Sequence, residues 1–221
     1  IAEIEILQQT SKNIKEVAPA NCLLISSDNT IKTWEYWTVE AKEFHETPEE
    51  AIVHTRELLI DAIKRQLVGD VPISTLLSGG LDSSIISMIA AEELKKQGKK
   101  LTTYSIDYED NEEYFKSSLF QPTSDKYFAE KMSKFIGSNH RKVVLNHIDL
   151  ASALEDAVIS RDLPGMADID SSMLLFCKEI RKDFVVGLTG ECADEIFGGY
   201  PWFTRDEMFY LDTFPWSRFV S

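Results

Sequence analysis

Hydrophobic positions along most of this chain follow two patterns that alternate. Short runs rich in apolar and β-branched residues recur, and such runs are typical of buried strands. They span residues 72–77, 101–106, 140–145 and 184–188. Between them, apolar residues return every three or four positions, which is the helical period. The alternation predicts an α/β fold, a parallel sheet with helices on both faces.

The helix starts can be placed from capping signals. Thr47-Pro48-Glu49-Glu50 combines a capping hydroxyl, a proline suited to the first helical position and a glutamate that can reach back to the cap. A second helix is expected from Ser84, after the first strand. Asp149 and Asp170 are expected to cap two further helices because aspartate is favoured at that position.

Residues 1–46 show a different pattern. Short apolar runs at 22–25 and 31–34 flank a polar Asp-Asn turn, which predicts a β-hairpin. A chain that begins at Ile1 without methionine also suggests that a domain precedes it. We therefore expect a domain boundary after residue 46.

A glycine-rich stretch, Ser78-Gly79-Gly80-Leu81-Asp82-Ser83-Ser84, joins the first strand to the next helix. Strand, glycine turn and helix form an anion-binding arrangement, since glycines admit a close approach and the first helical amides lack partners. The Lys-Ser or Lys-Thr pair of a Walker loop is absent, and Asp82 stands nearby. A carboxylate beside phosphates requires a divalent cation, so the stretch suggests Mg²⁺ and the pyrophosphate part of ATP. The alternative is an ordinary tight turn.

A second polar stretch, residues 189–200, follows the last predicted strand. It contains Glu191, Asp194 and Glu195 within five residues. An acidic helix N-terminus would explain them equally well in isolation. However, the carboxyl ends of parallel strands meet at one edge of a sheet, so this stretch is expected to face the glycine loop. Asp194 then becomes a second metal ligand, and Glu191 becomes available for proton transfer or substrate positioning.

Composition narrows the class of partner. The chain has 221 residues and a formal charge of −14, which disfavours nucleic acid binding. It has no apolar run long enough to cross a bilayer, so we expect no membrane association and a cytoplasmic location. Its three cysteines and four histidines show no spacing typical of a metal site.

The two polar stretches together resemble glutamine-dependent asparagine synthetase, a member of the ATP pyrophosphatase (PP-loop) superfamily with an adenine nucleotide alpha hydrolase-like fold. The resemblance rests on residues 78–84 and 190–200. It implies that residues 1–46 are the end of an N-terminal glutaminase domain and its linker, since Trp34-Glu35-Tyr36-Trp37 is similar to the exit from that domain. Residues 47–221 would be the ATP-binding synthetase domain, incomplete at its C-terminal end.

The resemblance also implies roles for individual residues. Glu191 matches a glutamate important for forming an aspartyl-adenylate, and Asp82 and Asp194 match residues associated with Mg²⁺. The remaining matched positions contact the nucleotide or its pyrophosphate: Leu77, Ser78, Gly79, Gly80, Leu81, Ser83, Ile106, Thr189 and Gly190. The implied reaction joins aspartate to ATP with release of pyrophosphate, and ammonia from glutamine then gives asparagine. A homodimer is a possible assembly.

Departures from the family pattern keep two alternatives open. Cys192 and Ala193 stand where the best-known members carry Gly and Ser, and residues 163–172 lack an expected arginine. A related enzyme that activates another carboxylate, such as a lactam or peptide-ring synthetase, is therefore one alternative. A non-catalytic nucleotide-binding module is the other. The chain has no N-terminal cysteine, so it is not expected to hydrolyse glutamine itself.

Overall fold

The computed structural model describes residues 16–116, 123–162 and 165–204. The chain falls into two compact units, Ile1–Ala51 and Ile52–Ser221. Residues 1–15 and 205–221, which end the two predicted domains, lie outside the described residues. So do residues 163–164 of the segment that lacks an expected arginine. In the described ranges, no helix has the length and apolar character needed to cross a membrane. The cytoplasmic location stays a prediction.

The first unit contains a β-hairpin. Strand β1 (Asn21–Ile25) pairs antiparallel with β2 (Ile31–Glu35). Asn29 closes the turn in the left-handed conformation, with φ at 64°, and its N–H donates to the Ser26 carbonyl at 2.9 Å. Asparagine tolerates this conformation better than most residues, which is why the Asp-Asn pair forms the turn. The predicted hairpin is confirmed.

The second unit is built on a parallel sheet whose strands lie in the order β5-β4-β3-β6. The strands are β3 (Ile73–Leu76), β4 (Thr102–Tyr108), β5 (Asn139–Leu145) and β6 (Val186–Leu188). Each matches one of the four predicted apolar runs. All three pairings are parallel, so the carboxyl ends of the strands share one edge.

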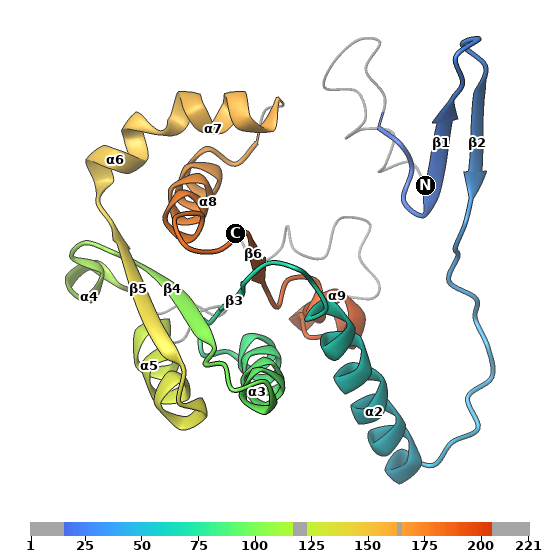
Figure 1. Ribbon diagram of the computed structural model, residues 1–221, viewed down its shortest axis with the longest axis horizontal. Helices are drawn as coiled ribbons and strands as arrows, with labels where there is room; N and C mark the ends of the chain where they lie inside the picture. Colours follow the sequence, from blue (N-terminus) through green and yellow to red (C-terminus); the bar gives the residue numbers. More distant parts are fainter. Residues whose placement is uncertain (1–15, 117–122, 163–164, 205–221) are drawn as a thin grey trace. The chain divides into compact units, whose positions relative to one another are not determined.

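Helices connect and cover the strands. They are α2 (Pro48–Gln66), α3 (Leu81–Lys96), α4 (Asn111–Tyr114), α5 (Asp125–Ile136), α6 (His147–Ser152), α7 (Leu154–Arg161), α8 (Ala167–Ile180) and α9 (Ala193–Phe197), followed by the 3₁₀ turn η1 (Pro201–Phe203). Figure 1 shows α3 and α5 on one side of the strands and α8 on the other. The predicted α/β fold with helices on both faces is confirmed.

Three expected helix starts were wrong by a few residues. Helix α3 begins at Leu81 rather than Ser84, so Asp82 lies in its first turn. Asn146, not Asp149, caps α6: its side chain accepts the Asp149 N–H at 2.8 Å and donates to the Asp149 carboxylate at 2.6 Å. Asp149 therefore acts three residues inside the cap, as in a capping box. Helix α8 begins at Ala167 rather than after Asp170.

The face of the sheet beneath α8 is aromatic and apolar. Tyr104 lies edge-on to Phe176 and Phe184, with ring centroids 6.5 and 5.9 Å apart. Ile180 completes the buried cluster. Burial of these rings provides the main apolar contact between α8 and the sheet.

The opposite face, beneath α3 and α5, is lined with hydroxyl groups. Thr75 Oγ1 lies 2.8 Å from Ser87 Oγ of α3, and Thr103 Oγ1 lies 2.9 Å from His140 Nδ1. Ser105 Oγ lies 3.1 Å from His140 Nε2. Burial lowers the pKa of His140, which keeps the ring neutral at neutral pH. Hydroxyl groups therefore join β3 to α3 and β4 to β5 on this face of the sheet.

Candidate active site

The glycine-rich stretch forms a tight turn between β3 and α3. The Gly80 N–H donates to Ser78 Oγ at 3.2 Å, and Ser83 Oγ lies 2.9 Å from Ser78 Oγ. Gly80 occupies the N-cap of α3 without a side-chain cap. The first amides of α3 are therefore left available to an anion.

Gly79 can be nothing larger than glycine. Its φ is +88°, and an added Cβ would lie 2.4 Å from the backbone of both Phe128 and Ala129. The turn is thus pressed against the backbone of α5. This contact fixes the position of the turn relative to α5.

The second polar stretch leaves β6 and meets the first turn of α3. An added Cβ on Gly190 would lie 3.0 Å from Asp82 Cβ and 3.1 Å from the Ser83 nitrogen. Cys192 then adopts the left-handed conformation, with φ at 69°, and α9 begins at the next residue. The structure therefore brings together two segments that lie far apart in the sequence.

Asp194 is packed closely against Gly199. An added Cβ on Gly199 would lie 1.9 Å from Asp194 Oδ1, and the Gly199 N–H donates to the Asp194 carbonyl at 2.9 Å. Tyr200 donates its hydroxyl to Glu195 at 3.1 Å, and this hydrogen bond raises the pKa of Tyr200. The Tyr200 ring stacks on Trp202 with centroids 4.3 Å apart.

A pocket of about 410 Å³ opens at the carboxyl edge of the sheet. Ten residues predicted for the site line it: Leu77, Ser78, Gly80, Asp82, Ser83, Ile106, Thr189, Gly190, Glu191 and Asp194. The other two lie outside the lining. Gly79 faces α5, and the Leu81 side chain is 74% exposed.

The last part of β4 extends beyond the end of β3. The Leu77 N–H donates to the Tyr104 carbonyl at 2.7 Å. Backbone groups two residues apart on a strand point to the same side, so those of Ile106 also face the β3 side. Because β3 ends at Leu76, no residue of this strand stands opposite Ile106. Its amide and carbonyl are thus directed toward the pocket edge.

Sequence reasoning missed an ion pair in the wall of the pocket. The Lys142 ammonium lies 2.6 Å from Asp107 Oδ2, and Asp107 Oδ1 accepts hydrogen bonds from the Tyr108 N–H and the Asn111 side chain, each at 2.9 Å. Burial alone would raise the pKa of Asp107, but Lys142, Asn111 and Tyr108 together bring it below its usual value. Asp107 is therefore ionised at neutral pH. Its place after Ile106 at a strand end was the signal that could have revealed it.

Asp82 and Asp194 are the predicted magnesium ligands. Both line the pocket, but the described residues contain no group of three or more His, Cys, Asp or Glu side chains arranged to hold a metal. Protein Mg²⁺ sites commonly use one or two carboxylates together with substrate phosphates and water. Asp82 and Asp194 therefore fit a metal that arrives with a polyphosphate.

Fold and pocket together define a class of protein. A parallel sheet with helices on both faces, a Ser-Gly-Gly turn that leads into a helix, and a pocket at the strand ends define an α/β domain with a candidate ligand site at the carboxyl edge of its sheet. The asparagine synthase family model matches residues 54–220. The chain belongs to the asparagine synthase family, as the resemblance indicated.

Individual relatives agree with this assignment. Asparagine synthetase [glutamine-hydrolyzing] 3 of Bacillus subtilis is 52% identical over 208 residues, which cover 94% of this chain and 33% of that protein. Amidase chyE of Penicillium rubens is 30% identical over 203 residues, covering 88% and 30%. The chain thus spans about a third of the length of these relatives. A solved NAD+ synthetase from Burkholderia pseudomallei has 12% identity and a TM-score of 0.34, and it covers 66% of this chain and 62% of that chain; the likeness is too distant to bear on function.

Proposed function

We propose that this chain is the ATP-binding part of an enzyme that makes asparagine from aspartate through a β-aspartyl-AMP intermediate. The observation that carries the proposal is the contact between Gly190 and the first turn of α3 at Asp82. It joins the two stretches that bear the resemblance at a single pocket. Family membership supports the same reaction.

ATP would lie across the carboxyl edge of the sheet. Adenine would lie on the side of the pocket lined by Tyr104, Met173 and Phe176, where the backbone of Ile106 is directed toward the pocket edge. The α3 amides and the Ser78 and Ser83 hydroxyls would donate to the pyrophosphate part. Leu77, Thr189 and Gly190 would complete the nucleotide contact.

Asp82 and Asp194 would hold Mg²⁺ together with the phosphates. The bound ion would neutralise negative charge on the departing pyrophosphate. The chain would contribute the orientation of these carboxylates. For Asp194 this orientation depends on the absence of a side chain at Gly199.

Two steps give the product. An oxygen of the aspartate side-chain carboxylate attacks the α-phosphorus, the bond to the bridging oxygen breaks, and pyrophosphate leaves. Ammonia then attacks the activated carbonyl, AMP leaves, and the nitrogen loses a proton. Glu191 borders the pocket next to Gly190, where its carboxylate can position the acceptor or accept this proton. The resemblance to glutamine-dependent asparagine synthetase implies that ammonia comes from glutamine hydrolysed in another domain.

The test uses the complete native polypeptide with ATP, Mg²⁺ and a panel of carboxylic acids. We expect pyrophosphate release stimulated by aspartate. Stimulation by another acid alone would assign the chain to a lactam- or peptide-ring-forming relative. ATP binding without turnover on any acid would favour a nucleotide-binding module.

A further inference from the structure

The pocket has two chemically different sides, one on each face of the sheet. The side beneath α8 is lined by apolar and aromatic residues, among them Tyr104, Met173 and Phe176. The other side, formed by β4, β5 and α5, carries Asp107, Lys126, Glu130, His140 and Lys142. The first side suits a purine base. The second requires a charged ligand group.

Negative charge dominates the lining. Seven carboxylates border the pocket: Asp82, Asp107, Asp125, Glu130, Glu191, Asp194 and Glu195. They would repel an anionic substrate that enters it. Two of these are proposed to be neutralised by Mg²⁺, but ATP adds further negative charge. Within a partly desolvated pocket such repulsion is stronger than in water. An acid acceptor therefore needs a cation of its own.

Among the described lining residues, two side chains are cations at neutral pH, Lys126 of α5 and Lys142 of β5. His140 does not contribute, because burial lowers its pKa. Both lysines belong to the charged side. No lysine or arginine of the described lining comes from the α8 side.

Each lysine is held in place by a carboxylate without being hidden from the pocket. Lys142 pairs with Asp107, and Lys126 pairs with Glu112 of α4. Their side chains remain 32% and 34% exposed. An ammonium carries three donor hydrogens, so one that is bound to a single carboxylate can still donate to a ligand. The pairs thus position the cations and leave donors for an anion.

We propose that Lys126 and Lys142 bind the second carboxylate of the acid acceptor, the one that does not react with ATP. For aspartate this is the α-carboxylate, and the α-ammonium would find acidic partners on the same side of the pocket. This inference rests on the proposed function. It assigns the recognition of the acceptor to α5 and β5. Residues 165–172, where the family resemblance led us to expect an arginine, contain no lysine or arginine.

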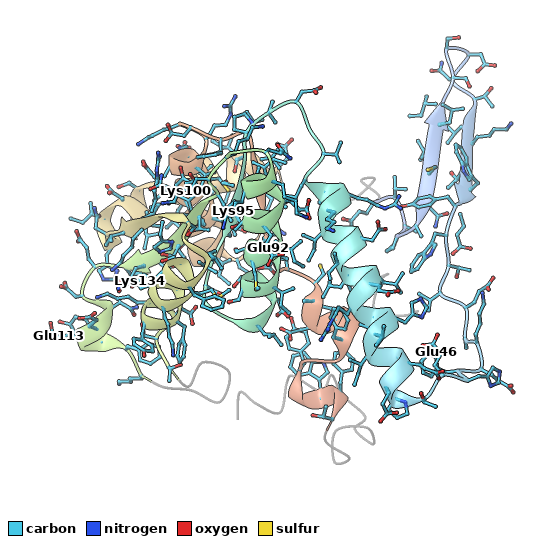
Figure 2. The ribbon with its side chains drawn as sticks, turned by 60° about the horizontal axis from the view of Figure 1, so that its bottom comes forward. Glu46, Glu92, Lys95, Lys100, Glu113 and Lys134 are labelled. Carbon is cyan, nitrogen blue, oxygen red and sulfur yellow. The ribbon has the colours of Figure 1, made fainter. Side chains whose placement is uncertain are left out.

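The test replaces each lysine with methionine, which preserves most of the apolar stem and removes the charge. In the complete native polypeptide, we expect Lys142→Met and Lys126→Met each to raise the KM for aspartate about 10- to 100-fold, the size of losing a charge-assisted hydrogen bond. The Kd of Mg-ATP measured without aspartate should change less than about twofold. Lys134→Met is the matched control, because Lys134 is exposed on the same helix α5 and lies outside the pocket lining (Figure 2).

A substrate analogue separates recognition from a structural effect. The α-amide of aspartate keeps the side-chain carboxylate and loses the α-carboxylate charge. The unmodified protein should prefer aspartate over this amide in kcat/KM, and Lys142→Met should lose most of that preference. The double variant Asp107→Asn with Lys142→Met should behave in the same way without leaving Asp107 buried and unpaired.

Each other outcome has a defined meaning. An unchanged KM for aspartate in both lysine variants would overturn the inference and leave the proposed function standing. Weakened Mg-ATP binding with normal aspartate dependence would assign the lysines to phosphate, which also overturns it. If the unmodified protein releases no pyrophosphate with aspartate, the proposed function itself fails.

Discussion

Gly190 and Asp82 are in direct contact. A methyl group on Gly190 would lie 3.0 Å from the Cβ of Asp82, closer than carbon atoms normally approach. The backbone that follows β6 therefore rests on the first turn of α3. Four predictions concern this pocket and its walls.

Replacement of Gly190 by alanine tests the contact. We expect Gly190→Ala to push the β6 turn away from α3 and to weaken Mg-ATP binding about tenfold, by calorimetry, because about 1–3 kcal/mol is typical of overpacking. Gly69→Ala serves as the control, since an added Cβ there meets nothing within 4 Å. Equal ATP affinity of the two variants would show that the contact does not shape the site.

The metal assignment predicts a conditional effect. Asp82→Asn and Asp194→Asn should each weaken ATP binding about tenfold or more in the presence of Mg²⁺, because a charged ligand is lost. Without Mg²⁺ the variants should bind ATP at least as well as the unmodified protein, since a charge that repels phosphate is gone. Calorimetric titrations with and without Mg²⁺ measure both quantities. A loss of affinity that is independent of Mg²⁺ would contradict the assignment.

Glu191 is predicted to act after the nucleotide has bound. Glu191→Gln keeps the size of the side chain and removes its charge, so the Kd of Mg-ATP should change little. Aspartate-dependent pyrophosphate release should fall about 100-fold or more, as expected for loss of acid–base or positioning chemistry. The assignment is wrong if the glutamine variant releases pyrophosphate at the normal rate.

Asp107 predicts a pH-dependent stability. Burial raises its pKa, but Lys142, Asn111 and the Tyr108 N–H lower it further, so the folded-state pKa lies below the unfolded value. A depressed pKa means that the ionised carboxylate stabilises the fold above about pH 4, and that this contribution is lost as the pH falls through the folded-state pKa. Asp107→Asn should therefore lower the free energy of unfolding by about 1–3 kcal/mol at pH 7 and by less at pH 3.

Urea unfolding at the two pH values measures the effect of Asp107→Asn. Asp61→Asn is the control, because Asp61 pairs with Arg65 on the exposed surface of α2, where such pairs contribute less than about 1 kcal/mol. A destabilisation by Asp107→Asn that is the same at pH 7 and pH 3 would show that the carboxylate charge is not the cause.

The strands and the meeting of the two polar stretches could be predicted from the sequence. Apolar runs located all four strands of the parallel sheet, because a strand that is buried on both faces forms a nearly continuous apolar run in the sequence. The rule that parallel strands end at a common edge then placed Asp82 and Glu191 at the same pocket. Neither inference needed any knowledge of side-chain packing.

The helix starts and the charged wall could not be predicted in the same way. Asp149 carries the residue type of a cap, but Asn146 is equally suitable and lies where the chain leaves β5. The pairing of Asp107 with Lys142 depends on the register between β4 and β5, which periodicity does not specify. The contact of Gly79 with α5 likewise depends on the tertiary position of a helix.

The hydroxyl-lined face of the sheet bears on the orientation of helix α3. Apolar surfaces tolerate sliding, whereas a hydrogen bond such as that between Thr75 and Ser87 accepts only a narrow range of angles. It therefore sets the rotation of α3 about its axis, and with it the direction in which the opening amides of that helix aim. A buried hydrogen bond between two hydroxyl groups would thus set how precisely the proposed phosphate contacts of α3 are oriented.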